Sequence, residues 1–101
     1  MSELSGGTTI YLRGLAYLQA GSSKDAVLQF QKLIDNQGIA VSVYWPLAHL
    51  GLARAYALGA EREKALENYR EFFALWKDAG RGLKLLQQAR SEYEKLSASR
   101  P

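Results

Sequence analysis

The chain has 101 residues, of which 48% are hydrophobic and 23% are charged, a composition typical of a globular domain and too apolar for a disordered segment. It has no cysteine, which excludes disulfides, thiolate metal sites and cysteine nucleophiles. The 13 basic and 10 acidic residues give a net charge of +3 and are interspersed, so we expect no nucleic-acid partner. No apolar run approaches the roughly 18 residues of a membrane span, and the start carries no signal-peptide pattern. We therefore expect a cytoplasmic location and no membrane partner.

Apolar residues recur with helical spacing, and neither sustained strand alternation nor an Asn-Gly hairpin occurs. The predicted fold class is all-α, with five helices and no sheet. The predicted helices span residues 8–20, 22–37, 46–58, 61–78 and 83–96. Glycines at positions 21, 38, 59 and 80 fall between them, where a chain leaving a helix often needs a left-handed residue.

Two of these helices have predicted start signals. Ser22 precedes the second helix, and its hydroxyl can cap the free amides of the first turn. Asp25 lies three residues on, a capping-box pattern that also suits the positive end of a helix. Residues 39–45 are expected to be a linker, because Pro46 biases Trp45 away from the helical region and fits the first position of the third helix.

The chain matches itself at an offset of 39 residues. In each match a small residue falls on a small one or an aromatic residue on an aromatic one. The pairs are Gly14 with Ala53, Ala16 with Ala55, Tyr17 with Tyr56, Ala26 with Ala65, and Phe30 with Tyr69. Small residues would let the two helices of a pair approach closely, and the large residues would pack toward the next unit. The sequence therefore predicts two copies of a helix pair.

These residues resemble the tetratricopeptide repeat, whose pattern runs from Trp, Leu, Gly and Tyr to Ala, Phe and Pro. The matching positions are Gly14, Tyr17, Ala26 and Phe30 in the first copy and Leu52, Ala53, Tyr56, Ala65 and Tyr69 in the second. The departures are Ile10 and His49 in place of Trp, Arg13 in place of Leu, and Gly38 and Lys77 in place of Pro. The offset of 39 exceeds the family's usual 34, and the linker before the third helix accommodates the excess.

The resemblance implies two antiparallel helix pairs stacked as a short right-handed solenoid, with a C-terminal capping helix. It implies one domain over residues 1–101, with repeat 1 at about 7–40, repeat 2 at about 46–79 and the terminal helix at about 83–96.

A narrower similarity is to the C-terminal tetratricopeptide region of certain bacterial serine/threonine protein kinases. The runs that carry it are residues 11–17, 30–34, 47–56 and 75–78. The kinase domain has no counterpart here, because a Gly-rich loop with its lysine and a His-Arg-Asp run are missing.

No group of residues points to catalysis, to a cofactor or to a metal. His49 is the only histidine and has no clustered acid or thiol, so a packed or capping role is expected. Carboxylates such as Glu61 and Glu67 alternate with basic residues, as on a solvated helix surface. Trp76 continues an aromatic stripe and is expected in the core, whereas Trp45 fits either the core or an aromatic ligand box.

Tetratricopeptide arrays bind partners on a concave face lined by the first helix of each pair. The partner-binding residues that this implies are Tyr11, Leu15, Leu18, Leu47, Leu50 and Arg54. Peptide-binding members of the family clamp a terminal carboxylate with Asn and Lys on this face, whereas Tyr11, Leu15 and Gly51 stand there in this chain. We therefore expect an apolar contact with a protein or peptide, and no carboxylate clamp.

The function expected is a protein–protein interaction module, a scaffold and not an enzyme. The alternative is a structural self-association unit, a homodimer formed through the first helix, within a larger protein such as a bacterial kinase. Residues 10–18 leave that helix apolar over most of its circumference, and a helix that is apolar all round is a buried helix. A preceding repeat or a second copy would cover it.

Overall fold

The computed structural model describes residues 6–35, 44–76 and 83–98, and in these ranges it contains helices and no strand. The helices are α1 (Gly6–Ala20), α2 (Ser23–Asp35), α3 (Tyr44–Leu58), α4 (Arg62–Trp76) and α5 (Leu83–Ala98). The predicted all-α class and its five helices are confirmed. The turns predicted at Gly38 and Gly80, and the linker over residues 39–43, lie outside the described residues.

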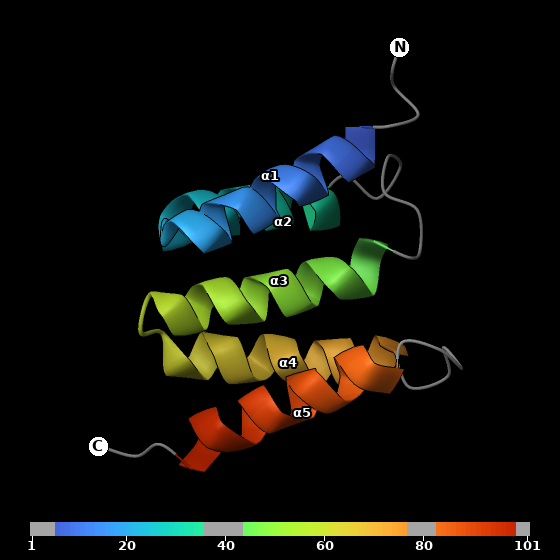
Figure 1. Ribbon diagram of the computed structural model, residues 1–101. Helices are drawn as coiled ribbons and strands as arrows, with labels where there is room; N and C mark the ends of the chain where they lie inside the picture. Colours follow the sequence, from blue (N-terminus) through green and yellow to red (C-terminus); the bar gives the residue numbers. More distant parts are fainter. Residues whose placement is uncertain (1–5, 36–43, 77–82, 99–101) are drawn as a thin grey trace.

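The helices pack as two pairs and a single helix (Figure 1). α1 packs on α2 and α3 packs on α4, and in each pair a short turn reverses the chain, so the two helices run antiparallel. α3 also packs against both helices of the first pair, while α5 lies on α4. The Cα radius of gyration is 13.2 Å, close to the value of about 13 Å for a compact chain of 100 residues.

The turns within the two pairs have the same hydrogen bonds. The N–H of Ser22 donates to the carbonyl of Tyr17 at 2.9 Å, and the N–H of Glu61 donates to the carbonyl of Tyr56 at 2.8 Å. Each bond spans five residues, as in the Schellman motif that ends many helices. At the start of α2 the Ser22 hydroxyl donates to the Asp25 carboxylate at 2.7 Å, a contact between the two side chains of the predicted capping box. The hydrogen bond from a backbone amide to the Ser22 hydroxyl stays a prediction. The internal match of the sequence is therefore repeated in the backbone.

Burial follows the same offset. The small residues Ala26 and Ala65 are both 0% exposed, and Phe30 and Tyr69 are 0% and 2% exposed. One matched pair differs, because Ala55 is fully buried while Ala16 is exposed.

Two buried clusters form the core. The first core cluster joins α2 to α3 through Ala26, Phe30, Leu33, Ala48, Leu52 and Ala55. The second core cluster joins α3, α4 and α5 through Leu50, Ala53, Ala65, Tyr69, Phe72 and Ala89. Trp76, expected in the core, is partly buried and packs against the second core cluster, where it stacks on Phe72 with ring centroids 5.5 Å apart.

α3 begins two residues before the predicted start. Tyr44 and Trp45 belong to its first turn, so they are not part of a linker. Pro46 is compatible with this start, because the amides of the first turn have no partner within the helix and a missing N–H costs nothing there. Trp45 is half-buried at this end of α3.

Candidate functional site

The first half of the predicted binding face lies on α1. Tyr11, Leu15 and Leu18 are each half-buried and pack against the first core cluster. The edge of the Tyr11 ring meets Phe30, with centroids 6.0 Å apart. Each of these side chains therefore packs against the core on one side and is accessible to solvent on the other.

The second half of the predicted binding face lies on α3, and one of its predicted residues, Leu50, does not belong to the surface. Leu50 is only 2% exposed, because its side chain enters the second core cluster, so it offers no surface to a partner. Leu47 is half-buried and Arg54 lies seven residues later, on the same side of the helix. Leu58 follows Arg54 by four residues, shares that side and is 49% exposed.

We define the α1/α3 face by these residues. Its members are Tyr11, Leu15, Leu18, Leu47, Arg54 and Leu58. Sequence reasoning missed Leu58 because it stands beside the turn glycine. Helical spacing would have found it, since Leu58 lies four residues after Arg54.

Arg54 is engaged within the chain. Its Nε and Nη2 donate to the two carboxylate oxygens of Glu92 on α5, both at 2.9 Å. The hydroxyl of Tyr69 donates to the same carboxylate at 2.8 Å. A bidentate pair of this kind is among the stronger polar contacts in proteins. It ties α5 to both α3 and α4.

The two partners of Glu92 have perturbed pKa values. Burial alone lowers the pKa of Arg54, but the hydrogen bonds and the charge of Glu92 outweigh it, so the pKa is raised. The pKa of Tyr69 is also raised, first by burial and then by the adjacent carboxylate. Arg54 therefore stays charged and paired, and a partner meets mainly apolar side chains beside it.

A groove lies on the other side of α3, between α2 and α4. One end is an apolar pocket of about 310 Å³ lined by Ser23, Lys24, Val27, Leu28, Ala55, Tyr56 and Glu61. The other end is a more polar hollow of about 370 Å³ lined by Gln31, Ile34, His49, Leu52, Tyr56, Lys64, Glu67, Asn68 and Glu71. Tyr56 borders both hollows, and we call the two together the α2/α4 groove.

His49 lies in the floor of this groove and is held by Asn68. Its Nδ1 is 2.9 Å from the Asn68 side-chain oxygen. The Asn68 amide nitrogen donates to the carbonyl of Lys64 at 3.0 Å, which fixes the amide so that its oxygen faces the ring. The Nδ1 atom of His49 therefore carries a proton and donates. A packed histidine was expected at this position.

The described residues show no metal site. No group of three His, Asp or Glu side chains within them is placed to hold a metal ion. Arg62 pairs with Glu63 at 2.9 Å and Lys64 pairs with Glu61 at 3.4 Å, at the start of α4. Across the same ranges, none of the helices combines the length and the apolar character needed to cross a bilayer.

Comparison of the chain with protein-family models, with curated proteins and with solved structures gives no match. The proposals for its function therefore rest on its own residues and geometry.

Proposed function

We propose that this protein is an interaction module of tetratricopeptide type, which binds another protein or a peptide through the α1/α3 face. The repeat is supported by the paired turns and the matched burial of residues 39 apart. It is also supported by the packing of α3 against both helices of the preceding pair. Two such pairs stacked in a right-handed sense, with α5 as the cap, would place α1 and α3 side by side on one face.

The observation that carries the function is the apolar character of that face. Large aliphatic and aromatic side chains on neighbouring helices are only partly covered by the chain itself, and Leu58 is 49% exposed. Binding would act through burial of these side chains, each contributing about 1.5–3 kcal/mol when fully covered. Arg54 and Glu92 would provide a polar rim that fixes the orientation of the partner.

Affinity capture with matched variants tests this. Leu58→Ser and Leu47→Ser remove apolar surface from the α1/α3 face, and Leu75→Ser makes the same change at a residue of α4 that is also 49% exposed. A partner retained by the unmodified chain and by Leu75→Ser, but weakened about tenfold by Leu58→Ser, supports the proposal. Equal retention by all variants contradicts it.

Self-association through α1 is the second candidate function. It is favoured by the exposure of α1 residues whose counterparts on α3 are buried. On α3 the residues that meet the first pair are Ala48, Gly51 and Ala55, all buried. Their counterparts 39 residues earlier on α1 are Thr9, Leu12 and Ala16, all exposed. Leu12 is 55% exposed. α1 thus has an open surface at the position where α3 stacks, suited to a second copy or to a preceding repeat in a larger protein such as a bacterial kinase.

Sedimentation equilibrium distinguishes this candidate from the first. A dimer at micromolar concentration that Leu12→Ser dissociates, and that Leu58→Ser leaves intact, supports association through α1. A monomer up to about millimolar concentration excludes it.

A further inference from the structure

We propose that the α2/α4 groove is a second docking surface, and that its occupant is a short amphipathic helix of a partner protein with aliphatic residues at one end and basic residues at the other. This surface lies on the opposite side of α3 from the α1/α3 face. The proposal therefore goes beyond the function proposed above and does not depend on it.

The shape of the groove fits a helix. Its floor is a row on one side of α3, formed by His49, Leu52 and Tyr56 at spacings of three and four residues. Its walls are α2 and α4, which both pack on α3 and extend along it in the same direction. From Lys24 to Ile34 the α2 wall covers eleven helical residues, a length of about 15 Å or three turns. A helix laid between two walls over an apolar floor is a recurring mode of peptide recognition.

The apolar end selects aliphatic side chains. Val27, Leu28, Ala55 and Tyr56 line the pocket there, and Leu28 is 58% exposed although its surroundings are apolar. Two lysines border this end. Lys24 lines the pocket, while the ammonium of Lys64 lies 5.5 Å from the centroid of the Tyr56 ring and pairs with Glu61 at 3.4 Å. Covering Val27 and Leu28 with aliphatic side chains removes apolar surface from water.

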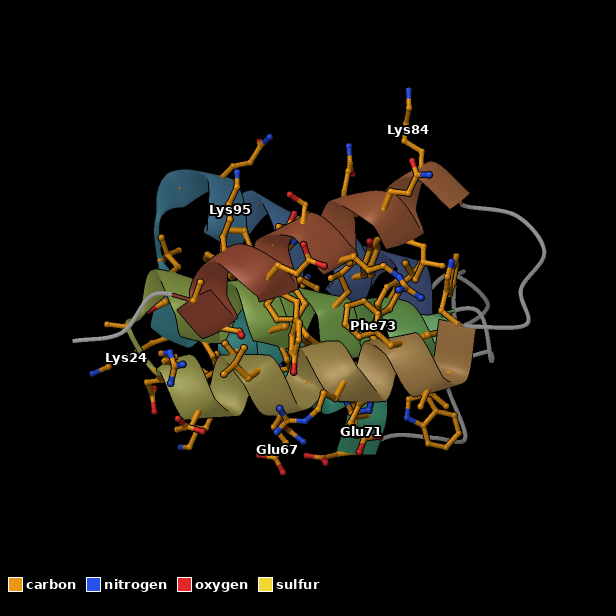
Figure 2. All side chains as sticks on the ribbon, turned by 90° about the horizontal axis from the view of Figure 1, so that it is seen from below. Lys24, Glu67, Glu71, Phe73, Lys84 and Lys95 are labelled. Carbon is orange, nitrogen blue, oxygen red and sulfur yellow. The ribbon has the colours of Figure 1, made fainter. Side chains whose placement is uncertain are left out.

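The other end selects basic side chains. Glu67 and Glu71 are exposed on successive turns of α4 and line the polar hollow. Figure 2 shows both projecting from the same side of α4, on the opposite side of the molecule from Lys84 and Lys95 of α5. Within the described part of the chain neither carboxylate forms an ion pair. Two arginines or lysines one turn apart would meet these two charges.

The spacing along the groove fixes the order of residues in the occupant. The apolar pocket borders Glu61, just before α4, and the carboxylates of Glu67 and Glu71 lie six and ten residues further along the chain. A helix that follows α4 therefore needs its basic residues about two to three turns from its aliphatic ones. This pattern separates the proposed occupant from a uniformly apolar segment.

The test is a titration of the isotope-labelled full chain, followed by amide chemical shifts. The probe is a synthetic alanine-rich peptide of about 16 residues, with two leucines one turn apart near one end and two arginines one turn apart about eight residues further on. We expect shifts confined to the lining residues of α2, α3 and α4. A peptide with glutamates in place of the arginines should bind at least fivefold more weakly.

Variants decide between specific docking and general adhesion. Glu67→Gln/Glu71→Gln should weaken binding about fivefold, and Leu28→Ser about tenfold. The matched controls Glu63→Gln/Glu94→Gln and Leu75→Ser change exposed residues outside the groove and should leave the affinity unchanged. Since all these side chains are exposed, circular dichroism should show the same helix content in each variant.

Three outcomes would overturn the proposal. They are no binding of the peptide, equal weakening by the variants and their controls, and shifts that map to α1 and the Leu58 side of α3. The last of these would support the α1/α3 face instead. If Leu58→Ser abolishes partner capture and the peptide does not bind in the groove, the proposed function stands and only the second docking surface is rejected.

Discussion

Phe30 shows how single residues determine the spacing of the helices. Its ring is fully buried, and a β-carbon added to Gly14 on α1 would lie 2.5 Å from its Cζ atom. A β-carbon added to Gly51 on α3 would lie 2.5 Å from its Cε1 atom. The ring is therefore enclosed between two helices that approach it only because neither has a side chain there. Sequence reasoning assigned Gly14 to close packing but placed Gly51 on the binding face, because one chain without coordinates does not show which helix faces the ring.

We predict that Gly14→Ala and Gly51→Ala each lower the free energy of unfolding by about 1–3 kcal/mol, since the ring cannot move away from one glycine without meeting the other. The higher helix propensity of alanine opposes this loss by about 1 kcal/mol. If the Phe30 ring could move aside, that gain would make the substitution stabilising. Urea midpoints measure the change. In a double-mutant cycle, Phe30→Leu should make Gly14→Ala nearly neutral; an unchanged cost there would show that the ring is not the cause.

Tyr69 gives a prediction for alkaline pH. Its ordinary pKa of 10.0 is raised in the folded chain, first by burial and then by the carboxylate of Glu92. Above pH 10 the unfolded chain loses this proton while the folded chain keeps it. The contribution of Tyr69 to the free energy of unfolding is therefore fully present below pH 10 and is lost as the pH rises further.

The slope from this one group is at most about 1.4 kcal/mol per pH unit. Urea midpoints between pH 9 and 11 should therefore fall more steeply for the unmodified chain than for Tyr69→Phe. Parallel curves for the two proteins would show that Tyr69 titrates normally.

At the scale of elements, the α1–α2 and α3–α4 turns have the same backbone conformation but different residues at the left-handed position. Gly21 ends α1 with φ of 79°, and Ala60 ends α3 with φ of 64°. A left-handed conformation suits glycine and strains alanine. The glycine of the second turn, Gly59, stands one position before the residue that needs it.

Ala60→Gly is accordingly expected to raise the free energy of unfolding by about 1 kcal/mol, by relieving that strain. Ala74→Gly, at an exposed position inside α4, should lower it by about the same amount. Thermal unfolding of both variants checks the signs. A destabilising Ala60→Gly would mean that the turn is not strained.

The contact between α3 and α4 depends on small residues at their closest approach. Ala65 is 0% exposed and belongs to the second core cluster. Ala65→Leu should lower the free energy of unfolding by about 1–3 kcal/mol through overpacking. Glu63→Ala, at a side chain that is 83% exposed, should be nearly neutral. Equal urea midpoints for the two variants would show that Ala65 is not at a close contact.

Element order was predictable because helical periodicity and turn residues act locally. The start of α3 was not, since nothing around Pro46 distinguishes the first helical position from the third. The Arg54–Glu92 pair was also hidden, because it joins residues 38 apart on helices that meet only after α5 has packed. Arg54 has the periodicity of the binding face and was therefore expected to contact a binding partner, whereas in the structure it pairs with Glu92 of the same chain.

At the scale of the whole molecule, the described ranges contain four leucines that are about half exposed, and all but Leu75 of α4 lie on the surfaces discussed above. Leu58 lies on the α1/α3 face, Leu28 in the α2/α4 groove and Leu12 on the outer side of α1, with exposures of 49%, 58% and 55%. The sequence predicted the first and the third from the apolar stripes of the repeat. It did not predict the groove, because that surface arises from three helices distant in the chain.

Photo-crosslinking from these leucines tests the central claim most directly. A photoreactive phenylalanine analogue replaces Leu58, Leu28, Leu12 or Leu75 in turn, and the crosslinked products are identified after exposure to an extract of the source cells. We predict that position 58 crosslinks to a different protein, and that position 75, equally exposed on α4, gives no comparable product. Crosslinks at position 58 only to a second copy of this chain, or no crosslinks there at all, would contradict the proposal that the α1/α3 face binds a protein partner.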